Sequence, residues 1–132
     1  MKNKTPKGIF VVDNKEATTK AIERIKKILT ITLSQVKSLK ENTKEENFDT
    51  KKLCEAIITN INILIDTVDK SRKTSLSKDL DYLYKHCLFS IVRVRDNEDF
   101  DFVDGVLDVL SNLTEGWERV DASIKKAPAF GW

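Results

Sequence analysis

The sequence predicts an all-α fold, an antiparallel up-down four-helix bundle with an N-terminal arm. Four long segments carry apolar residues at steps of three and four, the spacing of one face of a helix. Both prolines, Pro6 and Pro128, lie near the chain ends, so no proline interrupts these segments. Short polar breaks separate the segments, and short connections favour antiparallel neighbours.

Residues 1–12 are expected to form the arm. It begins polar and basic, and after Gly8 it carries the apolar run Ile9-Phe10-Val11-Val12. Burial of each large side chain in this run would contribute about 1.5–3 kcal/mol, so the run is expected to pack on the bundle. It would act either as a fixed staple at the bundle end or as a removable lid over a binding surface.

Asp13 and Glu16 have the spacing of a helix-capping pair and predict the start of the first helix. The segment Glu41–Asn47 has no apolar residue and is expected to be a loop. Asp49 is expected to cap a second helix that runs to about Lys70. The stripe of the first helix consists of Ile22, Ile25, Leu29, Thr32, Val36 and Leu39.

A third helix is expected from about Ser75 to Arg95, and Asn97 is expected to cap a fourth that ends before Pro128. The stripe of the third helix is Leu76, Leu80, Leu83, Cys87, Ile91 and Val94. The fourth carries Val103, Leu107 or Val106, Leu110, Leu113 or Thr114, Trp117 and Ile124. The length suits one core, so residues 1–132 are predicted to form a single domain with a tail at 127–132.

Composition argues against several classes of protein. Net charge is +2 with both signs interspersed, and the clearest basic cluster is Lys2, Lys4 and Lys7, so no nucleic-acid partner is expected. No apolar run has the length of a membrane span or the character of a signal peptide, which favours a cytoplasmic protein. Cys54 and Cys87 lie in apolar patterns and are expected to fill the core. No metal or cofactor site is predicted.

The second helix carries more apolar surface than one seam of a bundle requires. Its expected core face is Leu53, Ala56, Ile57, Ile61, Leu64 and Val68. Ile58, Ile63 and Ile65 lie on the two flanks of that face. The helix would therefore either be central, with neighbours on both sides, or line a groove for a helix of another protein. On the third helix, Tyr82 and Phe89 project away from the stripe, either to cover a loop or to bind a partner.

No catalytic residue is predicted. The one histidine, His86, has Ser90 four residues later, but no oxyanion-type loop or orienting acid accompanies them. The four glycines are scattered, which excludes a glycine-rich phosphate loop. A lone histidine on a four-helix bundle also fits a histidine phosphotransfer domain. His86 and Leu88 resemble that family's motif, whereas Phe89 and Ser90 stand where it has lysine and glycine.

A distinctive pattern spans roughly residues 50–120. It comprises Leu80-Asp81-Tyr82-Leu83-Tyr84 with Leu88, the break Arg95-Asp96-Asn97, then Phe102-Val103, Val106-Leu107, Leu110, Leu113 and Trp117-Glu118. Before it, the second helix ends in Leu64-Ile65-Asp66-Thr67-Val68-Asp69. In these features the chain resembles the flagellar export chaperone family FliS. The first third departs from the family: Ile25-Lys26-Lys27-Ile28-Leu29 stands where members carry a leucine-tyrosine-aspartate segment.

The resemblance implies a cytoplasmic bundle that binds the C-terminal segment of flagellin, prevents its premature polymerisation and delivers it to the export apparatus. Contact with export-gate components and self-association are compatible with that role. The resemblance also places Leu83, Tyr84 and Trp117 in the core. Partner contacts are expected at Ile9, Phe10, Ile58, Ile65, Tyr82 and Phe89. The alternatives are the phosphotransfer domain and a helical interaction or scaffold module for another client.

Overall fold

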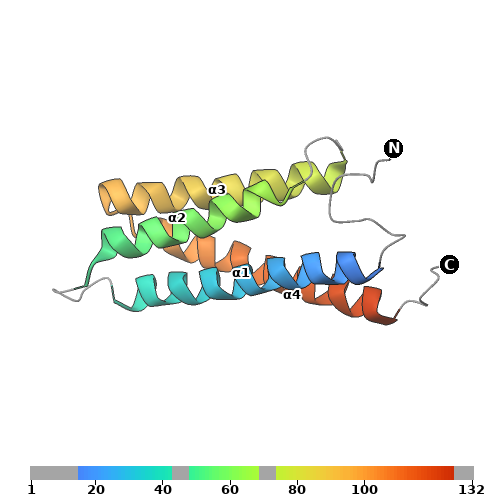
Figure 1. Cartoon of the computed structure of the whole chain (residues 1–132). Coiled ribbons are helices and arrows are strands. Elements are labelled where there is room, and N and C mark those ends of the chain that lie inside the picture. Colours follow the sequence, from blue (N-terminus) through green and yellow to red (C-terminus); the bar gives the residue numbers. More distant parts are fainter. Residues whose placement is uncertain (1–14, 43–47, 69–73, 127–132) are drawn as a thin grey trace, which may run out of the picture.

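The computed structural model describes residues 15–42, 48–68 and 74–126, and these residues form four helices and no strand. The helices are α1 (Lys15–Glu41), α2 (Thr50–Asp66), α3 (Ser75–Asn97) and α4 (Asp101–Lys126). Successive helices run in opposite directions (Figure 1), and they pack as a ring in which each helix contacts two others. The predicted all-α antiparallel up-down four-helix bundle is confirmed.

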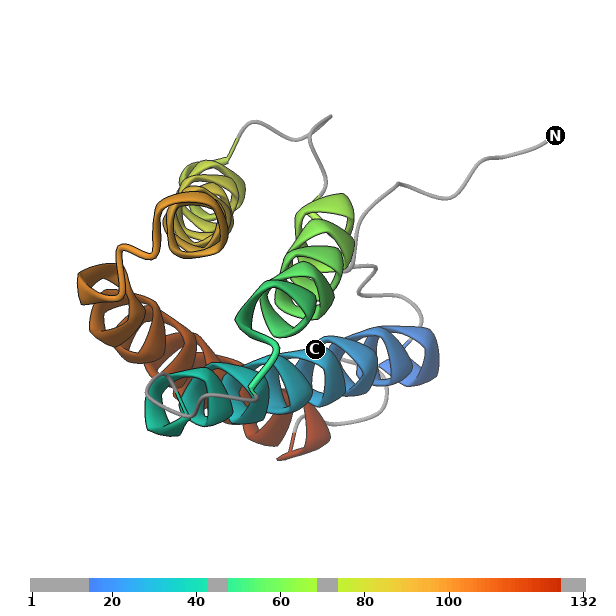
Figure 2. The same cartoon turned by 90° about the vertical axis from the view of Figure 1, so that its left-hand side faces the viewer.

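The ring is built from two closely packed pairs, α1 with α4 and α2 with α3. Figure 2 looks nearly along α2 and α3, whereas α1 extends across the view, so the two pairs cross at an angle. Both views show α3 and α4 close together at the turn that joins them and farther apart toward the other end of the bundle. The contact between α3 and α4 is accordingly less extensive than that within either pair.

Buried apolar residues from all four helices form one core. The predicted stripe of α1 is buried along its whole length. The other helices contribute Cys54, Ile57, Ile61, Leu64 and Ile65 from α2, Leu80, Tyr84, Cys87, Ile91 and Val94 from α3, and Val103, Val106, Leu110 and Trp117 from α4. The buried residues recur at steps of three and four, with one adjacent pair in α2 and one step of seven in α4, so the core follows the helical period.

The start of α2 is set by a local hydrogen bond. The carboxylate of Asp49 accepts a hydrogen bond from the backbone N–H of Lys52 at 3.0 Å, which confirms the predicted cap. The helix ends at Asp66, about one turn earlier than the predicted Lys70.

The predicted cap at Asn97 is wrong. Asn97 is the last residue of α3, because Glu98 adopts the left-handed conformation (φ 58°) and its N–H donates to the carbonyl of Val94 at 3.0 Å. A left-handed residue after the last turn is a common way to end a helix. The turn that follows delays the start of α4 to Asp101.

Two positions in the predicted stripe of α3 are wrong. Leu83 is only half-buried and lies outside the core cluster, because Tyr84, one residue later, occupies the place between Leu80 and Cys87. Leu76 is 52% exposed, since it lies in the first turn of α3, one turn before the first buried residue. Tyr84 and Trp117 do lie in the core, as the resemblance implied.

Several predicted features lie outside the described residues. These are the arm at 1–12 with Ile9 and Phe10, the cap at Asp13, most of the loop after α1, and the tail at 127–132.

Candidate functional site

The expected contact residues of α2 are buried or half-buried, whereas those of α3 are exposed. Ile65 is only 7% exposed and belongs to the core, so its predicted place on an open flank is wrong. The physical reason is that α2 packs between α1 and α3, which cover its wide apolar arc from both sides. Ile58 is half-buried and packs against the same core. Ile63, in contrast, is 42% exposed.

The two aromatic residues singled out on α3 lie on its outer surface. Tyr82 is 69% exposed and Phe89 is 56% exposed. His86 lies between them and stacks on Tyr82, with ring centroids 6.4 Å apart. Residues three and four apart share one side of a helix, so Tyr82, His86, Phe89 and Arg93 form a continuous row along α3.

Phe89 and Arg93 connect this row to α4. The ring of Phe89 meets Phe102 of α4 edge to face, with centroids 6.4 Å apart. The guanidinium of Arg93 lies 5.8 Å from the ring of Phe89 and 5.5 Å from that of Phe102, in cation–π contact. Its Nε and Nη2 donate to Oδ2 of Asp99 at 3.1 and 2.9 Å, which holds the guanidinium beside the turn between the helices.

A second row continues the surface on α4. Phe102, Val109 and Leu113 are seven and four residues apart, so they lie on one side of the helix. All three are half-buried and pack against the core. We call the two rows together the α3–α4 face: Tyr82, His86, Phe89 and Arg93 of α3 with Phe102, Val109 and Leu113 of α4. Its exposed aromatic rings and partly covered aliphatic side chains fit contact with an apolar helix surface.

The serine and cysteine side chains that could act as nucleophiles are buried inside the bundle. Ser90 is buried, and its hydroxyl donates to the backbone carbonyl of His86 at 3.0 Å. Burial raises the pKa of the Cys54 thiol to about 11 and that of the Cys87 thiol to about 12, so both are protonated at neutral pH. Within the part of the chain that the structure describes, no three potential metal ligands cluster together, and no helix is long and apolar enough to cross a membrane.

An ion-pair network joins α1 to α4 on the other side of α4. The ammonium of Lys26 lies 2.8 Å from Oδ2 of Asp121 and 2.9 Å from Oε1 of Glu118. Asp121 is buried, and its Oδ2 also contacts Lys125 at 3.1 Å. Its hydrogen bond to Lys26 lowers the pKa of the Asp121 carboxyl, and the same bond raises the pKa of Lys26. One feature of the sequence could have indicated that Asp121 is buried. It follows Trp117 by four residues and so continues the apolar stripe of α4.

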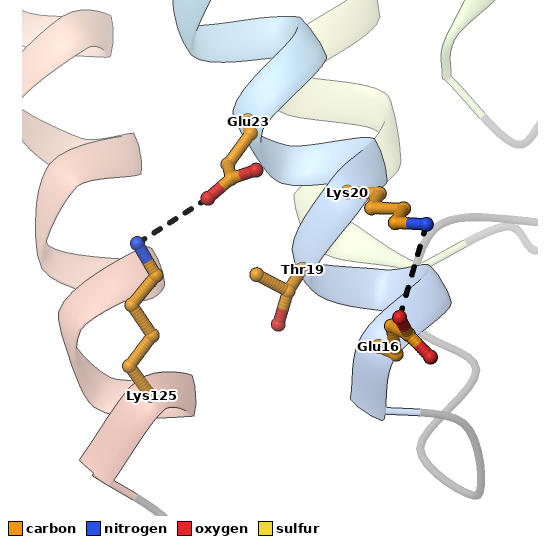
Figure 3. A pocket seen from close by; sticks show the side chains of 5 residues that line it. All are labelled: Glu16, Thr19, Lys20, Glu23 and Lys125. Carbon is orange, nitrogen blue, oxygen red and sulfur yellow. Dashed lines mark ion pairs between the residues drawn. The ribbon is translucent and has the colours of Figure 1, made fainter.

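The edge of this network borders a hollow of about 500 Å³ lined by Glu16, Thr19, Lys20, Glu23 and Lys125. Figure 3 shows Glu23 of α1 facing Lys125 of α4, while Glu16 and Lys20 pair along α1. These pairs are 3.4 and 3.8 Å long, and all four charged side chains are at least half exposed. No aromatic side chain is among the described residues that line this hollow, whereas the α3–α4 face carries exposed aromatic rings, so the α3–α4 face is the stronger candidate site.

Comparison with known proteins agrees with the resemblance. The model of the family described as Flagellar protein FliS matches residues 12–124. The match includes all of α1, so it extends over the first third, where the sequence pattern departs from the family. The same comparisons found no matching curated protein and no matching solved structure. Because the family match covers most of the chain, the protein belongs to the FliS family of flagellar export chaperones.

Proposed function

We propose that this protein is a cytoplasmic chaperone that binds the C-terminal segment of flagellin on the α3–α4 face. Binding would prevent premature polymerisation and deliver the subunit to the flagellar export apparatus. The observation that carries the proposal is the exposure of Tyr82 and Phe89 on one side of α3, next to the partly buried apolar side chains of α4. Family membership supports flagellin as the partner.

The proposed client is an amphipathic segment that is disordered on its own, and an exposed aromatic surface is suited to bind such a segment. A segment that is amphipathic and disordered alone gains order only when its apolar side chains are buried on a partner. The ordering opposes binding, so the surface must supply large contacts at low entropic cost. Aromatic residues do this well, because each buries a large area while fixing few torsions.

The test is calorimetric titration with a peptide of the C-terminal flagellin segment. Replacing both Tyr82 and Phe89 by alanine should weaken binding at least about tenfold, since exposed aromatic anchors carry much of the energy of such contacts. The wild-type titration should show a negative heat-capacity change, the signature of apolar burial. Circular dichroism of the variant should stay near wild type, because both side chains lie outside the core. The melting temperature should fall only slightly, because Phe89→Ala removes the contacts with Phe102 and Arg93 and leaves the core intact.

The matched control replaces Ile31 and Ile63 by alanine. These residues are also large, apolar and exposed, but they lie on α1 and α2. Their replacement should leave affinity unchanged. Equal losses in both double variants would mean that the peptide adheres to apolar surface in general, and the α3–α4 face would not be the site.

A further inference from the structure

Arg93 joins three other side chains at the end of the α3–α4 face that is nearest the turn between the helices. Its guanidinium lies 5.8 Å from the ring of Phe89 on α3 and 5.5 Å from the ring of Phe102 on α4. Nε and Nη2 both donate to Oδ2 of Asp99 in the turn, at 3.1 and 2.9 Å. The guanidinium is therefore held by an ion pair and by two aromatic rings at the same time.

A second arginine near the end of α3 forms a similar ion pair without the rings. Nε of Arg95 donates to Oδ1 of Asp96 at 2.8 Å. Both pairs are partly exposed, and exposed ion pairs add little stability. The cation–π contacts between described residues involve Arg93 and not Arg95. What distinguishes Arg93 is therefore its place on the rings of two helices.

Phe89 is the ring whose position depends on this arginine. It is 56% exposed, and an exposed side chain on a helix can adopt more than one rotamer. Phe102, which it meets edge to face at 6.4 Å, is half-buried and packs against the core. The guanidinium contacts both rings, so it favours the rotamer that keeps Phe89 beside the fixed ring of Phe102.

We infer that Arg93 is a positioning residue of the α3–α4 face, which holds the ring of Phe89 against Phe102 before the client binds. Asp99 orients the guanidinium and so acts one step further from the client. The inference rests on the function proposed above and assigns the residue that orders the site. Ordering a mobile side chain opposes binding, so an aromatic anchor that is already held binds with a smaller loss.

The first test needs no client. In the free wild-type protein with isotope-labelled phenylalanine, nuclear Overhauser cross-peaks should connect the rings of Phe89 and Phe102. Arg93→Gln should weaken these cross-peaks, because Phe89 then samples rotamers that point away from Phe102. Arg95→Gln is the matched control, with the same change of charge and size two residues later, and should leave them unchanged. Cross-peaks of wild-type intensity in Arg93→Gln would overturn the inference.

The second test measures the effect on the client by calorimetric titration. Arg93→Gln should bind the flagellin C-terminal peptide about fivefold more weakly than wild type, because Phe89 must be ordered during binding. Arg95→Gln should bind as wild type. Arg93→Lys should lose nearly as much affinity as Arg93→Gln, since an ammonium can pair with Asp99 but cannot lie flat against two rings. Full affinity in Arg93→Lys would assign the effect to charge alone and overturn the inference.

A double-mutant cycle tests whether Arg93 acts through Phe89. In a Phe89→Ala background, Arg93→Gln should change the affinity by less than about twofold, because the ring that it positions is gone. A further fivefold loss in that background, about the size of the single effect, would mean that Arg93 contacts the client directly. A lower melting temperature with unchanged affinity would make Arg93 a staple of the turn. Either result would overturn the positioning role.

The outcomes separate this inference from the proposed function. If wild type does not bind the peptide, the proposed function fails, while the cross-peaks of the free protein still decide whether Arg93 positions Phe89. If binding needs Tyr82 and Phe89 but Arg93→Gln binds as wild type, only the inference fails.

Discussion

Ile65→Asp is expected to lower the free energy of unfolding by about 4 kcal/mol or more, enough to unfold much of the protein. Ile65 is 7% exposed in the core of α2, so the new carboxylate would be buried without a partner. Ile63→Asp, two residues earlier on the same helix, should change the free energy of unfolding by no more than about 0.5 kcal/mol. The side chain of Ile63 is 42% exposed, and an added charge there remains in water.

Urea denaturation followed by far-UV circular dichroism measures both variants on one scale. The pair is well matched, because the helix, the parent residue and the substituted residue are the same. Similar urea midpoints for the two variants would show that the side chain of Ile65 is exposed to solvent. The flank of α2 that carries Ile65 would then again be a candidate partner-binding surface.

Asp121→Ala is expected to lower the free energy of unfolding by about 3 kcal/mol. Removing one member of a buried ion pair leaves the other without compensation, and the side chain of Lys26 is only 20% exposed. This value is at the low end of the range of about 3–5 kcal/mol for breaking a buried ion pair, because Lys26 still pairs with Glu118 at 2.9 Å. The double variant Lys26→Met with Asp121→Leu should recover most of the stability, since apolar side chains can replace such a pair.

The pH dependence of this difference follows from the lowered pKa of Asp121. A carboxyl whose pKa is lower in the folded state stabilises the protein above its unfolded-state pKa of about 3.9 and loses that contribution as the pH falls through the folded-state value. The difference between wild type and Asp121→Ala should therefore be constant near neutral pH and shrink below about pH 4. A constant difference down to pH 2 would mean that the ion pair is not its cause.

The sequence predicted the helices and most of the core because both depend on local periodicity. All six positions of the α1 stripe are buried as predicted, and the Asp49 cap uses the expected hydrogen bond. The errors arose where two neighbouring residues both fit the period. Leu83 and Tyr84 are adjacent large side chains that both fit the period, and the structure places Tyr84 inward, beside Trp117 of α4.

The candidate site was predicted less completely, because exposure depends on which helices are neighbours. Tyr82 and Phe89 could be identified from their distance from the stripe of α3. Ile65 could not be assigned, since its burial depends on α2 lying between α1 and α3. The contact between Arg93 and the rings of Phe89 and Phe102 joins two helices across a turn, and no periodicity within one helix encodes it.

The pairing of α1 with α4 has a consequence for synthesis on the ribosome. α2 and α3 are consecutive and can pair as soon as both have emerged, whereas α1 must wait for a partner nearly one hundred positions later; Lys26 and Asp121 are 95 residues apart. Closing so long a loop is slow compared with pairing adjacent helices. During translation α1 therefore has only α2 to cover its apolar stripe, and the nascent chain exposes that stripe until α4 leaves the exit tunnel.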